Sequence, residues 1–503
     1  SVLGILLVVS TAAGEGLTQI VDRQISSRLS AEKIPASPRS SDAEFLRRVY
    51  LDLVGVIPPR EKVAAFLDSN DPRKRSKLID ELLANPGFGR HLADIWDNLL
   101  FQRTTDNRAI RVEPLTEWLA EKFNANTPWN TLVTELLTAK GTQEENGATT
   151  FFLATQSADK MLDSVSRLFM GVRLECAQCH NHPFTGWKQT EYWGMAAFFM
   201  KVRIDGNPRA MKDAAKTPSV NESNRGRQRN LSESAKVVPP KFFQGEVADV
   251  RTAAELRPVL AQWLTRPDNK FFAKAFVNRV WSQLFGVGLV EPVDDMNEER
   301  EPTHPELLDA LAQHFATSGF DIKALYRAIC QSEAYQRTSR PVPGNESDNR
   351  LFARMNVKVF TPEQLYDSLA AVLGEPNAGR NAQRPAANPM RQPASPREQF
   401  VNFFAVGEDA KATDYDAGIP QALRLMNHPY TNRTAEAAAR QLTKGQPKAR
   451  AVESLYLATL SRRPTPAESA RLLKHLDKAE SPEVGYADIL WALLNSSEFT
   501  LNH

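Results

Sequence analysis

The stretch DAEFLRRVYLDLVGVIPP, residues 42–59, decides the fold class. Its apolar side chains recur every three or four residues, the spacing that places them on one face of an α-helix. The residues that share this face are Phe45, Leu46, Val49, Tyr50 and Leu53. Pro58 and Pro59 close the pattern, because proline lacks a backbone donor and cannot continue a helix. The stretch therefore predicts a helix that packs one face against a core.

The same spacing recurs along the whole chain. It is clear in DPRKRSKLIDELLANPGFG at 71–89, where Asp71 and Pro72 indicate a helix start, and in HLADIWDNLLF at 91–101. It returns in FFAKAFVNRVWSQLFG at 271–286 and in HPELLDALAQHFATSG at 304–319. No stretch shows the strict alternation of a strand, and no unit repeats at a fixed period. The predicted class is all-α.

The length of the chain and its polar segments predict how the helices are divided into domains. A chain of 503 residues exceeds the roughly 250–300 residues that one core usually serves, so we expect two main domains with long irregular linkers. Residues 205–236 contain scarcely any large apolar side chain. We expect an apolar N-terminal segment at 1–14 and helical domains at 15–204 and 249–503. A linker at 205–248 would join them, and a Pro/Arg-rich loop would occupy 375–397.

Composition excludes some classes of partner. Lys and Arg number 62 against 60 acidic residues, a net charge of +2, so no overall field favours nucleic acid. No stretch approaches the roughly 18–20 apolar residues of a membrane span, and we expect none in the mature chain. The first residues, SVLGILLVVSTAAGEG, run apolar and then small, as in a secretory signal followed by its cleavage zone. This pattern favours an exported protein in the periplasm or outside the cell.

The segment CAQCHNHP, residues 176–183, holds two of the three cysteines and two of the eight histidines. C-x-x-C-H is the attachment signature of c-type haem. Thiols three residues apart on a helical turn lie on one side, where both can bond to one porphyrin edge, and the next imidazole reaches the iron. The candidate cofactor-binding residues are Cys176, Cys179 and His180, with His180 as the iron ligand.

Two other chemistries remain open for this segment. Zinc could use Cys176, Cys179 and His180 or His182, although structural zinc sites usually draw a second ligand pair from a distant motif, and none exists here. The protein would then be a non-redox surface or scaffold protein. A redox-active dithiol is the other option, but no βαβ pattern surrounds it. The spacing favours haem c over zinc.

His304 is a second candidate metal ligand. In EPTHPELLD, residues 301–309, Thr303 and Glu306 have the spacing of a capping box, so His304 would sit at a helix N-terminus. The positive end of the helix dipole would keep its imidazole neutral and able to bind iron. The alternative interpretation is a helix start without a ligand role. An open face opposite His180 would instead allow a haem peroxidase or a ligand sensor.

Aromatic side chains crowd after the motif and have two interpretations. They could shield a porphyrin from water or serve as ordinary core. These residues are Phe184, Trp187, Tyr192, Trp193, Phe198 and Phe199. Elsewhere the sequence shows no Ser-His-Asp arrangement, phosphate-binding glycine loop or isolated carboxylate pair that would indicate hydrolysis.

Several motifs together resemble one known family. They are LFMGVRLECAQCHNHPF at 168–184, VNRVWSQLFGVGLVEPVDD at 277–295, TPEQLYDSLA at 361–370 and LYLATLSRRPTPAE at 455–468. In order and spacing they resemble the paired DUF1549 and DUF1553 domains, also called planctomycete cytochrome-type domains. The resemblance implies an exported protein with haem on Cys176, Cys179 and His180, and family members typically keep His182 and His304 as well.

The chain departs from the family pattern in two ways. Met296 stands where an aromatic residue usually follows the two aspartates, and we expect no separate N-terminal cytochrome c domain of the kind that many relatives possess. We therefore expect an exported c-type haem protein that works in electron transfer or in a larger redox assembly. Its electrons would come from a redox partner protein, in an assembly that could be associated with a membrane or cell surface.

Overall fold

Helix α2 (Asp42–Val54) connects the two hydrophobic cores of the computed structural model. The Ser41 hydroxyl accepts a hydrogen bond from the Glu44 amide at 3.2 Å and so caps the helix N-terminus. Gly55 ends the helix in the left-handed conformation, with φ of +74°. The apolar face predicted from the sequence is buried. The helix thus ends at Gly55, before the two prolines that the sequence marks as its limit.

The structure describes residues 16–101, 111–206, 218–223, 231–375, 395–404 and 425–503. Helix makes up 59% and strand 4%, so the mostly helical class is confirmed. The predicted apolar segment at 1–14 and most of the predicted loop at 375–397 lie outside these residues. Among the described residues, no helix combines the length and the apolar composition that crossing a bilayer requires.

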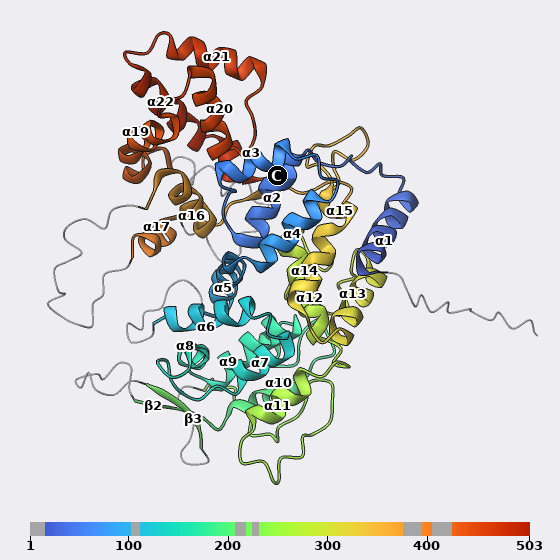
Figure 1. Cartoon of the computed structure of the whole chain (residues 1–503). Helices are drawn as coiled ribbons and strands as arrows, with labels where there is room; N and C mark the ends of the chain where they lie inside the picture. Colours follow the sequence, from blue (N-terminus) through green and yellow to red (C-terminus); the bar gives the residue numbers. More distant parts are fainter. Residues whose placement is uncertain (1–15, 102–110, 207–217, 224–230, 376–394, 405–424) are drawn as a thin grey trace, which may run out of the picture.

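Helices fill most of the first two hundred residues (Figure 1). They are α1 (Leu17–Ala31), α2, α3 (Arg60–Asp68), α4 (Lys74–Ala84), α5 (Pro86–Phe101), α6 (Glu113–Asn124), α7 (Trp129–Leu137), α8 (Thr150–Thr155), α9 (Ala158–Val165) and α10 (Gln189–Ala196). Helix α4 begins after Arg73, because Asp71 bonds the Arg73 amide at 2.8 Å and forms a turn before the helix rather than its cap.

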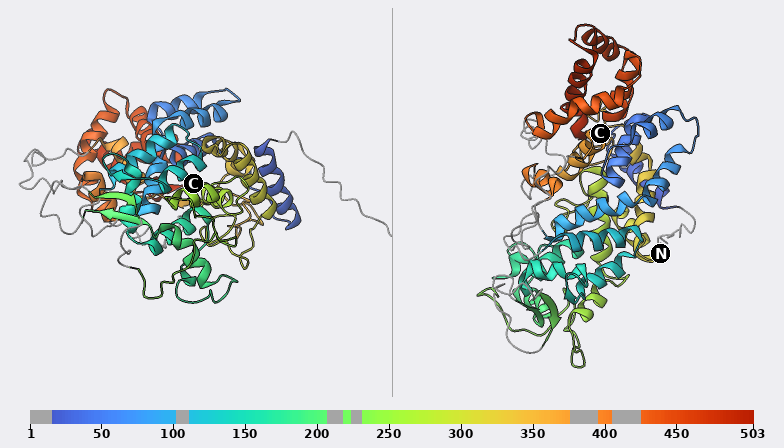
Figure 2. Two further views of the ribbon diagram at one scale, coloured as in Figure 1. Left: turned by 90° about the horizontal axis from the view of Figure 1, so that it is seen from below. Right: turned by 60° about the vertical axis from the view of Figure 1, so that its left-hand side comes forward.

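The rest of the chain continues in helices. They are α11 (Arg257–Leu264), α12 (Phe272–Phe285), α13 (Pro305–Thr317), α14 (Ile322–Gln331), α15 (Glu333–Gln336), α16 (Pro362–Leu373), α17 (Pro396–Phe404), α19 (Pro429–Thr443), α20 (Lys448–Thr459), α21 (Pro466–Leu476), α22 (Pro482–Leu494) and α23 (Ser497–Thr500). Figures 1 and 2 show α19–α22 at one end of an elongated molecule and strands β2 and β3 near the other.

Two small antiparallel sheets accompany the helices. One has the order β1-β3-β2, built from Gly141–Thr142, Ser219–Glu222 and Val202–Asp205. The other pairs β4 (Lys358–Val359) with β5 (Leu501–Asn502). Strands of two to four residues are too short to show alternation, which explains why the sequence did not predict them.

The predicted division at residues 205–248 is not confirmed. One continuous core contains buried residues from Leu17 to Val202, before that segment, and from Leu256 to Met355, after it. Within the segment, β3 pairs with β1 and β2, and Phe243 belongs to the same core. A second core is formed by Phe360 to Phe499 together with residues from and just after α2.

Two buried arginines of α2 join these cores. Arg47 is 1% exposed and donates to the carbonyls of Thr459 at 2.9 Å and Phe499 at 2.7 Å. Arg48 is equally buried and donates to the Tyr335 carbonyl at 2.7 Å. Helix α2 therefore hydrogen-bonds the last helices of the chain through its polar side chains while its apolar side chains pack into the core.

Candidate functional site

The CAQCH segment, residues 176–180, lies in a turn that precedes helix α10. Ala177 packs into the core with 1% of its surface exposed, whereas Cys176, Cys179 and His180 are exposed. The three side chains that the haem signature requires are therefore the ones that reach the surface. The residues between them face the protein and hold the turn.

Hydrogen bonds from α10 and α9 fix the backbone of this turn. The Gln178 carbonyl accepts from Trp193 Nε1 and from Gln189 Nε2, each at 3.0 Å. Gln189 Nε2 also donates to the Cys179 carbonyl at 2.8 Å. The Gln178 side chain donates to Asp159 Oδ2 at 3.1 Å. These side chains of α9 and α10 thus hold the turn from the side of the core and leave both sulfurs exposed.

The two histidines of the segment have different surroundings. His180 Nδ1 lies 2.6 Å from the Asn181 carbonyl, and because a carbonyl only accepts, Nδ1 must be the donor. In the neutral form of the His180 ring, Nε2 then carries the lone pair, the arrangement usual for an imidazole that binds a metal. His182 Nδ1 instead accepts from the amides of Phe184 and Thr185 at 3.2 and 3.0 Å. The His182 ring therefore stabilises the turn in which it lies.

The two thiols of the segment are unpaired and lie near the surface. Cys176 and Cys179 are free, and Cys179 Sγ lies 3.6 Å from the Ser234 hydroxyl. Partial burial and the nearby carboxylates of Glu175 and Asp295 raise the pKa of the Cys176 thiol. A raised pKa disfavours the thiolate, the form that both zinc binding and thioether formation use. In the described part of the chain, no three His, Cys, Asp or Glu side chains are grouped to hold a metal ion.

His304 occupies a buried position elsewhere in the fold. Its surface is 4% exposed, and burial lowers the pKa of its imidazole to about 4, which keeps the ring neutral. Nδ1 lies 3.0 Å from the Thr303 hydroxyl, and the ring packs 5.6 Å from that of Phe352. Nε2 has no hydrogen-bond partner among the described residues. These contacts do not include the CAQCH segment.

The predicted capping box beside His304 does not form. His304 itself is the N-cap of α13, without a side-chain capping bond. The Thr303 amide donates to the Leu289 carbonyl at 2.8 Å, so this backbone is held by another segment instead. Sequence spacing identifies the helix start correctly but not the residue that caps it.

The aromatic residues after the motif are mostly core. Trp187 is 4% exposed, and Tyr192, Trp193, Phe198 and Phe199 are completely buried. Phe184 differs, with 74% of its surface exposed. Its position after the exposed His180 makes it the one aromatic of this group that could cover a group held at the surface.

Two family models match the chain. Residues 20–204 match PSCyt2 and residues 256–476 match PSD1, described as "Protein of unknown function" DUF1549 and DUF1553 respectively. The chain belongs to the paired DUF1549 and DUF1553 family. No curated protein and no solved structure matches the chain. We refer to residues 20–204 as the DUF1549 region and to residues 256–476 as the DUF1553 region; the CAQCH segment lies in the former.

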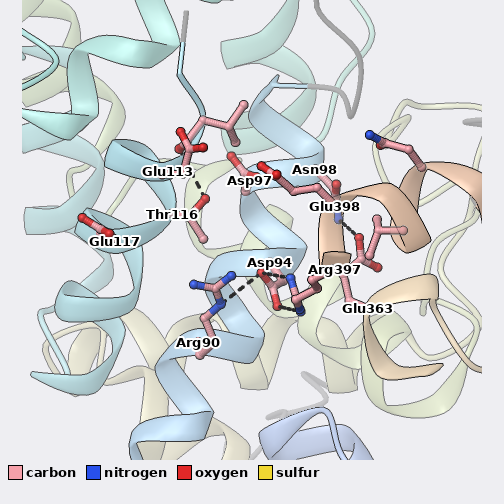
Figure 3. A pocket seen from close by; sticks show the side chains of 13 residues that line it. Arg90, Asp94, Asp97, Asn98, Glu113, Thr116, Glu117, Glu363, Arg397 and Glu398 are labelled. Carbon is pink, nitrogen blue, oxygen red and sulfur yellow. Dashed lines mark hydrogen bonds and ion pairs between the residues drawn. The ribbon is translucent and has the colours of Figure 1, made fainter. Parts of the chain in front are cut away.

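A cavity of about 290 Å³ lies between the two regions (Figure 3). Helices α5 and α6 of the DUF1549 region and α16 and α17 of the DUF1553 region line it. Its polar lining consists of Arg90, Asp94, Asp97, Asn98, Glu113, Thr116, Glu117, Glu363, Arg397, Glu398 and Asn402. Sites for small molecules are frequent at such junctions.

Arg397 joins the helices at one side of this cavity. Its Nη2 lies 2.7 Å from Asp94 Oδ2 on α5 and 2.7 Å from Asp367 Oδ2 on α16. Nε also donates to Asp367 at 2.8 Å, which makes that contact bidentate. Arg90 adds an ion pair to Asp94 at 3.3 Å. Two guanidinium groups and two carboxylates therefore balance one another.

Asp97 takes no part in these ion pairs. Burial first, and then the neighbouring Asp94 carboxylate, raise the pKa of Asp97 to about 7. The Thr116 side chain is its hydrogen-bond partner, but Oδ1 is buried and has no partner among the described residues. Figure 3 shows Asp97 opposite Glu113 and Thr116 of α6.

Sequence reasoning did not find this cavity. Arg90, Asp94, Asp97 and Asn98 are spaced so that they share one face of α5, and this spacing is a signal visible in the sequence. A charged helix face is usually solvated, however. The helix that covers this face, α17, follows about three hundred residues later.

Proposed function

We propose that this protein carries one covalent c-type haem on Cys176 and Cys179, with His180 as its iron ligand, and that it works in electron transfer. The observation that carries the proposal is the outward display of these three side chains from an anchored turn. When bound, the cofactor supplies a one-electron couple. The apolar first residues and the chemistry of haem attachment support a location in the periplasm or outside the cell.

Neighbouring residues support this proposal in two ways: they hold the backbone of the turn, and they orient the His180 ring. Gln178 and Gln189 hold the backbone so that the thiols stay accessible for thioether bonds. The Asn181 carbonyl orients the His180 ring and leaves Nε2 as its metal-binding atom. Because the site lies at the surface, a redox partner protein could approach it directly, as electron transfer requires.

Periplasmic production with a haem-attachment system tests the proposal. We expect the purified protein to show a Soret band, a haem c pyridine haemochrome spectrum and a mass increase of one haem. The variant carrying Cys176→Ala and Cys179→Ala should lose all three. Cys330→Ala is the matched control, because Cys330 is buried in α14, outside the motif, and its replacement should leave the spectrum unchanged.

Other outcomes would overturn the proposal. A colourless protein with stoichiometric zinc, lost in the double variant, would identify a non-redox scaffold. A colourless protein without metal would exclude both. Cyanide should leave the spectrum of an electron carrier unchanged. A clear spectral shift would instead indicate an open iron face and favour a peroxidase or a ligand sensor.

A further inference from the structure

We propose that Asp163 takes up a proton when the haem is reduced, so that the redox potential of the protein depends on pH near neutrality. The inference rests on the proposed function and adds a regulation to that same site. Asp163 lies in the last turn of α9, outside the CAQCH segment. Its side chain is partly exposed, so the carboxyl can exchange protons with water.

Helix α9 presents two carboxyl groups toward the turn that holds the cysteines. Asp159 and Asp163 are four residues apart and share one face of the helix. Gln178 Nε2, from the middle of the turn, donates to Asp159 Oδ2 at 3.1 Å. Tyr192 on α10 donates its hydroxyl to Asp163 Oδ1 at 2.9 Å, and the adjacent Trp193 donates to the Gln178 carbonyl at 3.0 Å. Asp163 therefore belongs to the layer of side chains that supports the turn, without being part of the motif.

The surroundings of Asp163 keep its carboxyl close to the point of ionisation. Burial raises its pKa from 3.8 to about 7, against the hydrogen bond from Tyr192, which lowers the pKa. The groups that face it are Asp159 on α9, Tyr192 on α10, Glu175 in the segment before Cys176, and Arg167 just after α9. The two carboxylates among them add to the rise, and the guanidinium opposes it. At neutral pH a small change in the nearby charge therefore shifts the protonation of Asp163, whereas an ordinary aspartate stays ionised.

Asp163 lies within electrostatic reach of the motif, because the two share a charged neighbour. Burial first, and then the Glu175 carboxylate, raise the pKa of the Cys176 thiol, and Glu175 also acts on Asp163. An electron added at the motif acts on Asp163 in the same direction as the Glu175 charge. It therefore favours the protonated form of the carboxyl.

The coupled step balances in charge and in atoms. One electron from the redox partner protein reduces the haem, and one proton from water binds the Asp163 carboxylate; on reoxidation both leave. The redox potential should therefore fall as the pH rises through the window around 7 in which Asp163 titrates, and should be level on either side of it. A threefold gain in the proton affinity of Asp163 on reduction converts to a total fall of about 28 mV, since a tenfold change is about 59 mV for one electron.

Potentiometric titration of the haem-loaded full chain, at a series of pH values from about 5 to about 9, measures this dependence. We expect a fall of about 28 mV or more, centred near neutral pH. The infrared difference spectrum between the two redox states at neutral pH should also show a carboxyl group that gains a proton on reduction.

Three variants assign the proton to Asp163. Asp163→Asn should make the potential independent of pH in this window and remove the infrared signal. Tyr192→Phe keeps the carboxyl but removes the donor that lowers its pKa, so the fall should move to higher pH. Asp97→Asn is the matched control: burial raises the pKa of Asp97 to about 7 as well, but Asp97 bonds Thr116 at the cavity between α5 and α6, so the dependence should remain.

The outcomes separate this inference from the proposed function. A haem-loaded protein whose potential is constant around neutral pH would overturn the inference alone. So would an unchanged pH dependence in Asp163→Asn or in Tyr192→Phe, or its loss in Asp97→Asn. A protein without haem would overturn the proposed function, and this inference with it.

Discussion

Lys358 on β4 and Asp52 on α2 form a buried ion pair, with 2.7 Å between Nζ and Oδ1. The two side chains are 7% and 3% exposed. Asn502 donates to the same carboxylate oxygen at 2.7 Å, and the Tyr335 hydroxyl donates to Oδ2 at 2.8 Å. The Asp52 carboxylate thus binds three residues that lie far from it in the chain. Replacing it should therefore show how much these contacts contribute to the stability of the fold.

Asp52→Ala should lower the free energy of unfolding by about 3–5 kcal/mol, since it leaves the Lys358 ammonium buried without its partner. Urea denaturation followed by circular dichroism measures the change. Asp477→Ala, which removes the exposed partner of Lys448, should cost less than about 1 kcal/mol. Equal losses in the two variants would show that the Asp52 pair contributes little to stability.

The buried His91 should make the protein less stable in acid. Burial lowers the pKa of His91 from 6.5 to about 4, so the unfolded chain binds a proton that the folded chain excludes between these values. The contribution is complete above pH 6.5 and is lost as the pH falls toward 4, to a total of about 3 kcal/mol. His91→Gln should reduce the loss of stability between pH 7 and pH 5 in urea titrations. His314→Gln, at an exposed position, should not.

Asp97 should have the opposite dependence on pH. Because burial raises the pKa of Asp97 from its ordinary value of 3.8 to about 7, the stability that the protonated carboxyl contributes is complete below pH 3.8 and is lost as the pH rises to 7. Asp97→Asn should therefore raise the free energy of unfolding at pH 8 by roughly 1–3 kcal/mol and change it little at pH 4. A destabilised variant at pH 8 would contradict the assignment of a buried, penalised carboxylate.

The Gln189 side chain should control the order of the CAQCH turn. Gln189→Glu keeps the size of the side chain but removes the amide hydrogens that bond the Gln178 and Cys179 carbonyls, so we expect a loss of about 1–2 kcal/mol. Amide hydrogen exchange of residues 176–182 should accelerate, and the yield of haem attachment should fall. Thr190→Ala alters an exposed neighbour and provides the control. Unchanged exchange would show that the turn is held by its other contacts.

The sequence predicted which segments are helical but not how they are buried. In α2 the spacing of Phe45, Val49 and Leu53 was sufficient to predict both the helix and its core face. The same helix also buries Arg47 and Asp52, which no spacing rule could show, because their partners lie hundreds of residues away. The spacing of apolar residues predicts only the apolar face of a helix. It does not predict contacts that polar side chains make on the other faces, as in α2.

The two candidate sites differ in the same way. Cys176, Cys179 and His180 are adjacent in the chain, so the motif was visible without a structure. The cavity depends on Asp97 and Arg397, which only the tertiary fold brings to one place. Whether Trp187 shields a cofactor or fills the core was also undecidable from sequence, because both uses require the same apolar side chain.

The arginines of α2 carry a consequence for how the chain matures. Arg47 and its partner Phe499 are separated by 452 residues, so the guanidinium is synthesised long before the carbonyl that satisfies it. Until residue 499 emerges, burying α2 would leave an unpaired cation in an apolar interior. Early compaction around this helix is thereby penalised, so α2 should become buried only after the C-terminal helices have formed.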